Sequence, residues 1–217
     1  ERMLPDVILL EDRPGGFTAY LDGLAAGRRE AEVTGSAVVN CNPFTLGHLY
    51  LLQTAAARCG VLHVFVVEED RSAFPFEVRF GLVREGVREI DNLVLHRGGS
   101  YIISSATFPS YFLKEPGSVV EIHARFDLAL FGGRIAPTLG INRRFVGEEP
   151  YCPVTNRYNE IMEQELPRRG IAVEIIPRLE KNGEAVSASS VRRNLAAGNL
   201  DAVKELVPAS TWKFLRS

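Results

Sequence analysis

The sequence has few cysteines and no long hydrophobic run, and each absence excludes a class of protein. No apolar stretch approaches the roughly 20 residues that a helix needs to cross a bilayer, and the first residues lack the apolar core of a signal peptide. The three cysteines, Cys41, Cys59 and Cys152, are odd in number and do not have the spacing of metal ligands. We therefore expect a cytoplasmic protein that has no membrane partner and keeps its thiols reduced.

A strong excess of charge is absent as well. The 217 residues carry a formal net charge of −2, with 24% charged and 46% hydrophobic residues. This balance is typical of a globular chain and argues against nonspecific nucleic-acid binding. The length suffices for one well-filled α/β domain. Because the chain begins with Glu1 instead of methionine, we expect a fragment of a longer protein.

Apolar runs alternate with helical patterns along most of the chain. We predict strands over 36–41, 61–67, 93–96, 101–103, 144–147 and 171–177. We predict helices over 17–24, 47–58, 76–90, 119–131, 155–166 and 187–197, with one or two more between 200 and 215 and an irregular connection over 135–141. Such alternation indicates βαβ crossovers and a parallel sheet. The expected fold is α/β, a Rossmann-like doubly wound sheet of about five strands with a C-terminal helical tail, over residues 36–217. Residues 1–35 are expected to be an N-terminal remnant with a short helix.

Two charged positions in these helices have plain interpretations. Arg79 is expected on an exposed, solvated helix face. His123 and Asp127 are four residues apart in the helix over 119–131. Because two residues do not make a metal site, we expect a surface pair there.

A turn between a buried strand and a helix carries the first binding motif. The strand stops at Asn42-Pro43, and Gly47-His48 then opens a helical pattern. Amide N–H groups at a helix N-terminus favour an anion, glycine lets a ligand approach the backbone, and His48 can donate to a phosphate oxygen. An ordinary strand–helix turn that contains a histidine remains an open alternative.

A second motif follows about 140 residues later in the stretch 186–195. Ser187 or Ser189 can cap the helix that follows, and Arg192 lies one turn inside it. Hydroxyl groups, helix N–H groups and a guanidinium at one helix end suit a triphosphate, although serine caps followed by surface arginines are common. The two motifs together make a nucleotide site more credible than either does alone.

The pair of motifs resembles the nucleotidyltransferase superfamily, with its HxGH and ISSTxxR signatures. Thr45 stands where many members carry the first histidine, and Ala188 stands at one signature hydroxyl. Within the superfamily the chain is similar to the citrate lyase ligase family over roughly residues 36–215. The stretches that carry this similarity are 42–48, 74–79, 101–114, 144–150 and 186–192. The stretch 101–114 is the most specific, because it does not belong to the superfamily at large. Family members usually carry an acetyltransferase-like domain before this one, which we expect the fragment to lack.

The resemblance implies an AMP-forming ligase that uses ATP and Mg²⁺. Acetate would attack the α-phosphorus of ATP, and the acetyl group would pass to the thiol of the coenzyme-A-like prosthetic group on the citrate lyase carrier subunit. We assign catalysis to Thr45, His48 and Arg192, and ATP binding to Asn42, Phe44, Gly47, Gly147, Glu148, Glu149, Ser187 and Ser189. Ser104, Ser105, Thr107 and Tyr111 are assigned to the acetate and thiol side of the pocket, and no residue is assigned as a metal ligand.

Two other classes of function stay open at this point. One is another adenylyltransferase, of the pantetheine-phosphate or nicotinamide-mononucleotide type, although the stretch 101–114 speaks against it. The other is a catalytically idle nucleotide-binding module.

Overall fold

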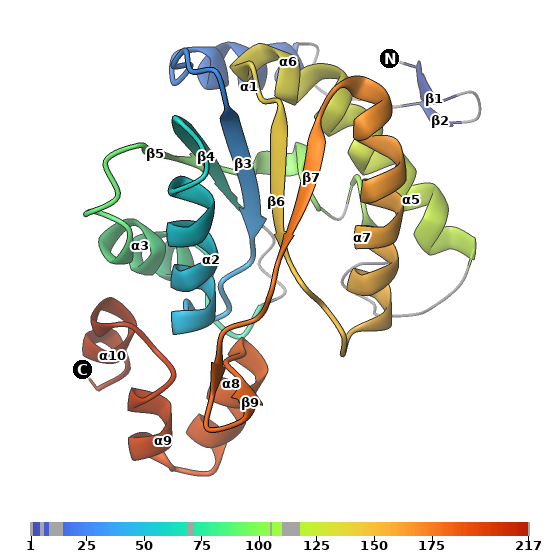
Figure 1. The fold of residues 1–217 in the computed structure, drawn as a ribbon. Helices are drawn as coiled ribbons and strands as arrows, with labels where there is room; N and C mark the ends of the chain where they lie inside the picture. The colour runs from blue at the N-terminus through green and yellow to red at the C-terminus, as the bar shows by residue number, and fades with distance from the viewer. Residues whose placement is uncertain are drawn as a thin grey trace.

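Five parallel strands form the central sheet of the protein, in the order β5-β4-β3-β6-β7 (Figure 1). The computed structural model describes residues 2–4, 7–8, 15–68, 72–104, 106–109 and 118–216. The strands are β3 (Thr34–Val39), β4 (Val61–Val66), β5 (Leu93–Arg97), β6 (Arg143–Gly147) and β7 (Ala172–Ile176). Because the strand order reverses between β3 and β6, the sheet is doubly wound, and the predicted fold class is confirmed.

Helices cover both faces of this sheet and divide the interior into two main cores. One face carries α2 (Leu46–Ala56) and α3 (Phe76–Gly86), and the apolar residues between them and the sheet form what we call the α2–α3 core. The opposite face carries α1 (Gly16–Ala25), α5 (Ser118–Leu130), the π-helix η2 (Phe131–Ile135), α6 (Ala136–Leu139) and α7 (Pro153–Glu165).

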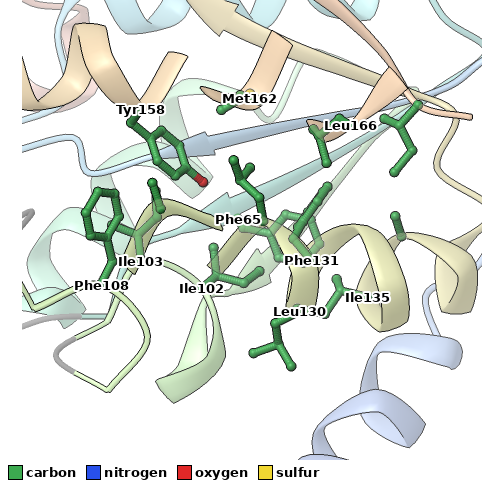
Figure 2. Close-up of a cluster of buried hydrophobic side chains, with 14 of the residues drawn as sticks. Phe65, Ile102, Ile103, Phe108, Leu130, Phe131, Ile135, Tyr158, Met162 and Leu166 are labelled. Atoms are coloured by element: carbon green, nitrogen blue, oxygen red, sulfur yellow. The ribbon is translucent and has the colours of Figure 1, made fainter. Parts of the chain in front are cut away.

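The apolar residues of this second face form the α5–α7 core. Figure 2 shows Phe65 of β4 meeting Phe131 of η2 there, at 6.2 Å between ring centroids. Neighbouring residues of one strand serve opposite cores: Val38 packs on the α5–α7 core and Val39 on the α2–α3 core. This alternation explains why the strands read as continuous apolar runs in the sequence.

The C-terminal segment forms a small helical unit below the carboxyl edge of the sheet (Figure 1). A hairpin of β8 (Glu180–Lys181) and β9 (Glu184–Ala185) leads into α8 (Ala188–Ala196), α9 (Leu200–Lys204) and α10 (Ala209–Leu215). Val191, Val203 and Val207 make its own small core, and α10 also packs against α3. The predicted helical tail is confirmed, whereas the hairpin was not predicted.

Three further short elements lie outside the central sheet and the C-terminal unit. β1 (Arg2–Leu4) and β2 (Val7–Ile8) pair antiparallel, and η3 (Pro167–Arg169) follows α7. None of the described helices combines the length and the apolar character needed to cross a membrane.

Two predictions of local structure are wrong. The stretch 101–103 is not a strand: η1 (Gly99–Tyr101) is a 3-10 helix, and the next residues, Ile102 and Ile103, are apolar because they enter the α5–α7 core. The connection over 135–141 is helical, because η2 and α6 prolong α5 until Gly140 ends the helix with a φ of 71°. Pro137 lies at the start of α6, directly after the π-helical turn of η2.

The expected surface positions of Arg79 and Asp127 are also wrong. Arg79 is 0% exposed and lies on the buried side of α3. Asp127 is buried as well, and its carboxylate accepts hydrogen bonds from the Ile103 amide, the Thr107 hydroxyl and the Tyr158 hydroxyl, at 2.7, 2.8 and 2.8 Å. Burial raises the pKa of Asp127, and these three hydrogen bonds oppose that rise.

Candidate active site at the carboxyl edge of the sheet

A cavity of about 820 Å³ lies where the strand order reverses. Its walls come from the carboxyl ends of β3, β6 and β7 and from the first turns of α2. The β8–β9 hairpin and the N-terminus of α8 complete them. Open α/β sheets bind their ligands at this place, because the crossovers diverge to opposite faces and leave a crevice.

The N-terminus of α2 presents His48 to this cavity. Thr45 caps the helix: its side chain accepts a hydrogen bond from the His48 amide at 3.3 Å, and its own amide donates to Nδ1 of His48 at 3.1 Å. Because Nδ1 accepts, the neutral ring carries its proton on Nε2. Burial, together with the charge of Arg178, lowers the pKa of His48 to about 4. His48 is therefore a neutral hydrogen-bond donor at physiological pH.

Gly47 brings the second motif against the first. A Cβ atom on Gly47 would lie 2.7 Å from the carbonyl oxygen of Val186, closer than any side chain permits. Ser187 follows directly and caps α8 by accepting from the Ser190 amide at 3.1 Å. The N-termini of α2 and α8 thus meet at one cavity, and the structure brings together the two motifs that the sequence separates by about 140 residues.

The neighbouring arginines of α8 have different positions. Arg192 donates to the carbonyl oxygen of Asn42, and at 3.2 Å to the Ser189 hydroxyl, so it joins α8 to the loop before α2. Arg193 lines the cavity and donates a weak 3.4 Å hydrogen bond to Ser190. The cavity wall therefore includes Arg193, which was not assigned from the sequence, and does not include Arg192, which was.

The residues after β6 and β7 form the opposite wall. Gly147, Glu148 and Glu149 line it, as their assignment to ATP binding requires. The carboxylate of Glu149 accepts from the amides of Tyr151 and Cys152, both at 3.1 Å, and forms a 2.6 Å ion pair with Arg178.

Arg178 is a site residue that the sequence interpretation missed. It lines the cavity, and its guanidinium lies over the ring of Tyr151, 5.3 Å from the centroid. Its position in the sequence could have identified it, because Arg178 follows Pro177 directly after the last strand of the sheet. Residues at the carboxyl ends of parallel strands border the ligand crevice in such sheets.

Two residues assigned to ATP binding shape the loop and do not line the cavity. The side-chain oxygen of Asn42 accepts from the Phe74 amide at 3.1 Å. Phe44 is fully buried in the α2–α3 core, with its ring stacked near His48 at 6.1 Å between centroids. Both residues support the turn from which His48 projects.

Ser104 and Thr107, two of the residues assigned to the acetate and thiol side, do not line the cavity. Ser104 and Thr107 are buried and hydrogen-bond one another, and Thr107 also donates to Asp127. Ser105 and Tyr111 lie outside the described residues. The remaining assigned residues, Thr45, His48, Gly47, Ser187 and Ser189, all line the cavity.

Few side chains in and around the cavity could bind a metal ion. The residues that the structure describes contain no group of three or more histidine, cysteine, aspartate or glutamate side chains that could hold one. Glu148 and Glu184 do line the cavity. Since Mg²⁺ keeps several waters and binds through substrate phosphates, this sparse set fits an ion that enters with a triphosphate.

Comparison with known proteins adds two findings. Residues 34–215 match the family model of the citrate lyase ligase C-terminal domain. The chain is 47% identical over 212 residues to the [Citrate [pro-3S]-lyase] ligase of Klebsiella pneumoniae, covering 96% of this chain and 62% of that protein. It is 43% identical over 216 residues to the enzyme of the same name from Escherichia coli (strain K12), covering 97% and 61%. The chain therefore spans less than two thirds of the length of these relatives.

Solved structures agree with the fold. TmcAL of Thermotoga maritima, bound with alpha-thio ATP, superposes with a TM-score of 0.56 at 14% identity, covering 85% of this chain and 55% of that one. Pantothenate synthetase from Thermus thermophilus superposes with a TM-score of 0.51 at 17% identity, covering 90% and 68%. At these identities the likeness establishes a shared architecture and nothing more.

Proposed function

The chain belongs to the citrate lyase ligase C-terminal domain family, and from this premise we propose that it is an AMP-forming ligase. It activates acetate with ATP and acetylates the thiol of the coenzyme-A-like prosthetic group on the citrate lyase carrier subunit. The observation that carries the proposal is the meeting of two helix N-termini, those of α2 and α8, at one cavity beside His48. Two such termini favour a polyanion, and ATP is the polyanion that this reaction consumes.

In the first step an oxygen of acetate attacks the α-phosphorus of ATP. The bond from that phosphorus to pyrophosphate breaks, and acetyl-adenylate and pyrophosphate form. Negative charge builds on the phosphate oxygens, where the Nε2–H of His48 and the helix N–H groups donate hydrogen bonds. Arg193 lines the same cavity and balances part of the charge of the triphosphate. The reaction needs positioning and charge neutralisation, and no protein nucleophile.

In the second step the thiol of the prosthetic group gives its proton to water, and its sulfur attacks the acetyl carbonyl carbon. AMP leaves, and the thioester forms. The wall that faces the α5–α7 core includes Val38, Val146 and Cys152, which pack against that core. Such an apolar wall suits the acetyl methyl group and limits hydrolysis of the adenylate by water.

Mg²⁺, when bound with the triphosphate, neutralises part of the phosphate charge. Glu148 and Glu184 are the cavity carboxylates that would hold it, directly or through water. Glu149 is a weaker candidate, because its two oxygens already accept from Arg178 and from two backbone amides.

Exchange of labelled pyrophosphate into ATP tests the first step. We expect exchange when acetate, ATP and Mg²⁺ are present, and none when acetate is omitted. Exchange that ignores acetate and rises with a phosphopantetheine compound or nicotinamide mononucleotide would instead identify an adenylyltransferase. No exchange with any of these acceptors, from a folded protein that binds ATP, would identify an idle nucleotide-binding module.

A further inference from the structure

The two strands that flank the cavity separate before they reach it. β3 pairs with β6 only through Gly35–Arg143 and Ser36–Arg144. In contrast, β3 stays paired with β4 as far as Val39, and β6 with β7 as far as Gly147. The ladder therefore does not set the spacing between the ends of β3 and β6, whose last residues line the cavity.

Arg79 ties together the wall on the β3 side. Its guanidinium donates to the carbonyl oxygens of Asn40, just after β3, and Val67, just after β4, both at 2.8 Å. It also donates to the side-chain oxygen of Asn40 and to the carbonyl oxygen of Phe74, both at 3.0 Å. Asn40 lines the cavity, so a fully buried cation holds one wall from behind.

Arg178 does the same on the β6 side. From the end of β7 it donates to the carbonyl oxygen of Glu148 at 2.9 Å and to the carboxylate of Glu149 at 2.6 Å. Glu149 in turn holds the amides of Tyr151 and Cys152, which begin the approach to α7. One guanidinium thus joins the end of β7 to the whole turn after β6.

We infer that Arg79 and Arg178 are positioning residues that fix the two separated walls of the cavity at the spacing required by the triphosphate. The inference rests on the proposed function, since it takes ATP as the ligand. Hydrogen bonds to a charged donor are about twice as strong as neutral ones. A lysine keeps the charge but is a point donor without the planar fork, so it cannot make the same set of bonds. Small displacements of binding groups cost a large part of the rate, on the order of 10²-fold for about 1 Å.

Three matched arginine-to-lysine variants test this inference. Arg79→Lys and Arg178→Lys each change one of these two guanidinium groups. Arg97→Lys is the control, because Arg97 joins the ends of β5 and β4 through Glu68, at 2.7 Å, but does not line the cavity. The Kd for ATP is measured by calorimetry without acetate, the kcat of acetate-dependent exchange is measured separately, and thermal unfolding reports stability.

In Arg79→Lys and Arg178→Lys we expect the Kd for ATP to rise about tenfold and the kcat of exchange to fall by about 10–10²-fold. In Arg97→Lys we expect the Kd and the kcat to stay within about twofold of the wild-type values. A purely structural role would lower the melting temperature and leave the Kd of the folded molecules unchanged, which would overturn the inference. Equal weakening in Arg97→Lys would overturn it as well. Should Arg79→Lys fail to fold, Arg178→Lys decides, because Arg178 lies at the partly exposed cavity wall. A wild-type protein that binds ATP but shows no acetate-dependent exchange refutes the proposed function alone, and the ATP affinities still decide the roles of the two arginines.

Discussion

Replacing Gly47 with alanine probes the contact on which the site depends. The added Cβ would lie 2.7 Å from the Val186 carbonyl oxygen, whereas ordinary contacts begin at 3.4 Å, so the two backbones must separate by about 0.7 Å. The neighbour is backbone and cannot rotate away. Forcing such an overlap costs about 1–3 kcal/mol, and the better helix propensity of alanine returns at most about 1 kcal/mol. We expect a loss of about 0–3 kcal/mol in the free energy of unfolding.

The effect of Gly47→Ala on ligand binding should exceed its effect on stability. Moving the start of α8 away from α2 separates the two helix N-termini that share the triphosphate, so we expect the Kd for ATP to rise at least about tenfold. Urea unfolding and calorimetry with ATP measure the two quantities. Gly81→Ala is the matched control, because Gly81 lies inside α3 with no heavy atom within 4 Å of its added Cβ.

The control should gain about 0.5–1 kcal/mol of stability from helix propensity and bind ATP like the wild type. The reasoning would be refuted if Gly47→Ala behaved like Gly81→Ala in both measurements. That result would mean that the approach of Val186 to Gly47 does not hold the two motifs together.

Three further predictions concern the groups that surround the triphosphate. His48→Ala should lower the rate of acetate-dependent exchange by about 10²–10³-fold without unfolding the protein, and an unchanged rate in a folded variant would remove His48 from the mechanism. Arg192→Lys should slow exchange about tenfold, because lysine cannot bridge the Asn42 carbonyl and Ser189 together, and an unchanged rate would show that this link is dispensable. Because the pKa of His48 is lowered from 6.5 to about 4, the unfolded chain binds a proton in this window that the folded chain does not, so the free energy of unfolding should fall as the pH falls from 6.5 to 4. His48→Gln should reduce that slope in urea titrations at several pH values, and an identical slope would contradict the lowered pKa.

The alternation of apolar runs and helical patterns determined the fold class without any structure. Each strand of the sheet was predicted within a few residues, because strands buried on both faces are continuous apolar runs. The helix start at Ser187 was also within reach of the sequence, since a capping hydroxyl acts on amides only two or three residues away. The family likewise followed from motifs whose residues are close neighbours in the chain.

Only the tertiary structure decided where individual side chains went. The pattern of α3 does not distinguish a solvated Arg79 from a buried one, because two of its carbonyl partners, Asn40 and Val67, lie 39 and 12 residues away in the chain. Thr107 carries the hydroxyl expected in a substrate pocket, but Asp127, 20 residues later, engages it inside the protein. Arg178 enters the site because β7 ends beside β6. Local patterns determine backbone state and caps, whereas the partners of a buried charge depend on which distant strands the sheet places side by side.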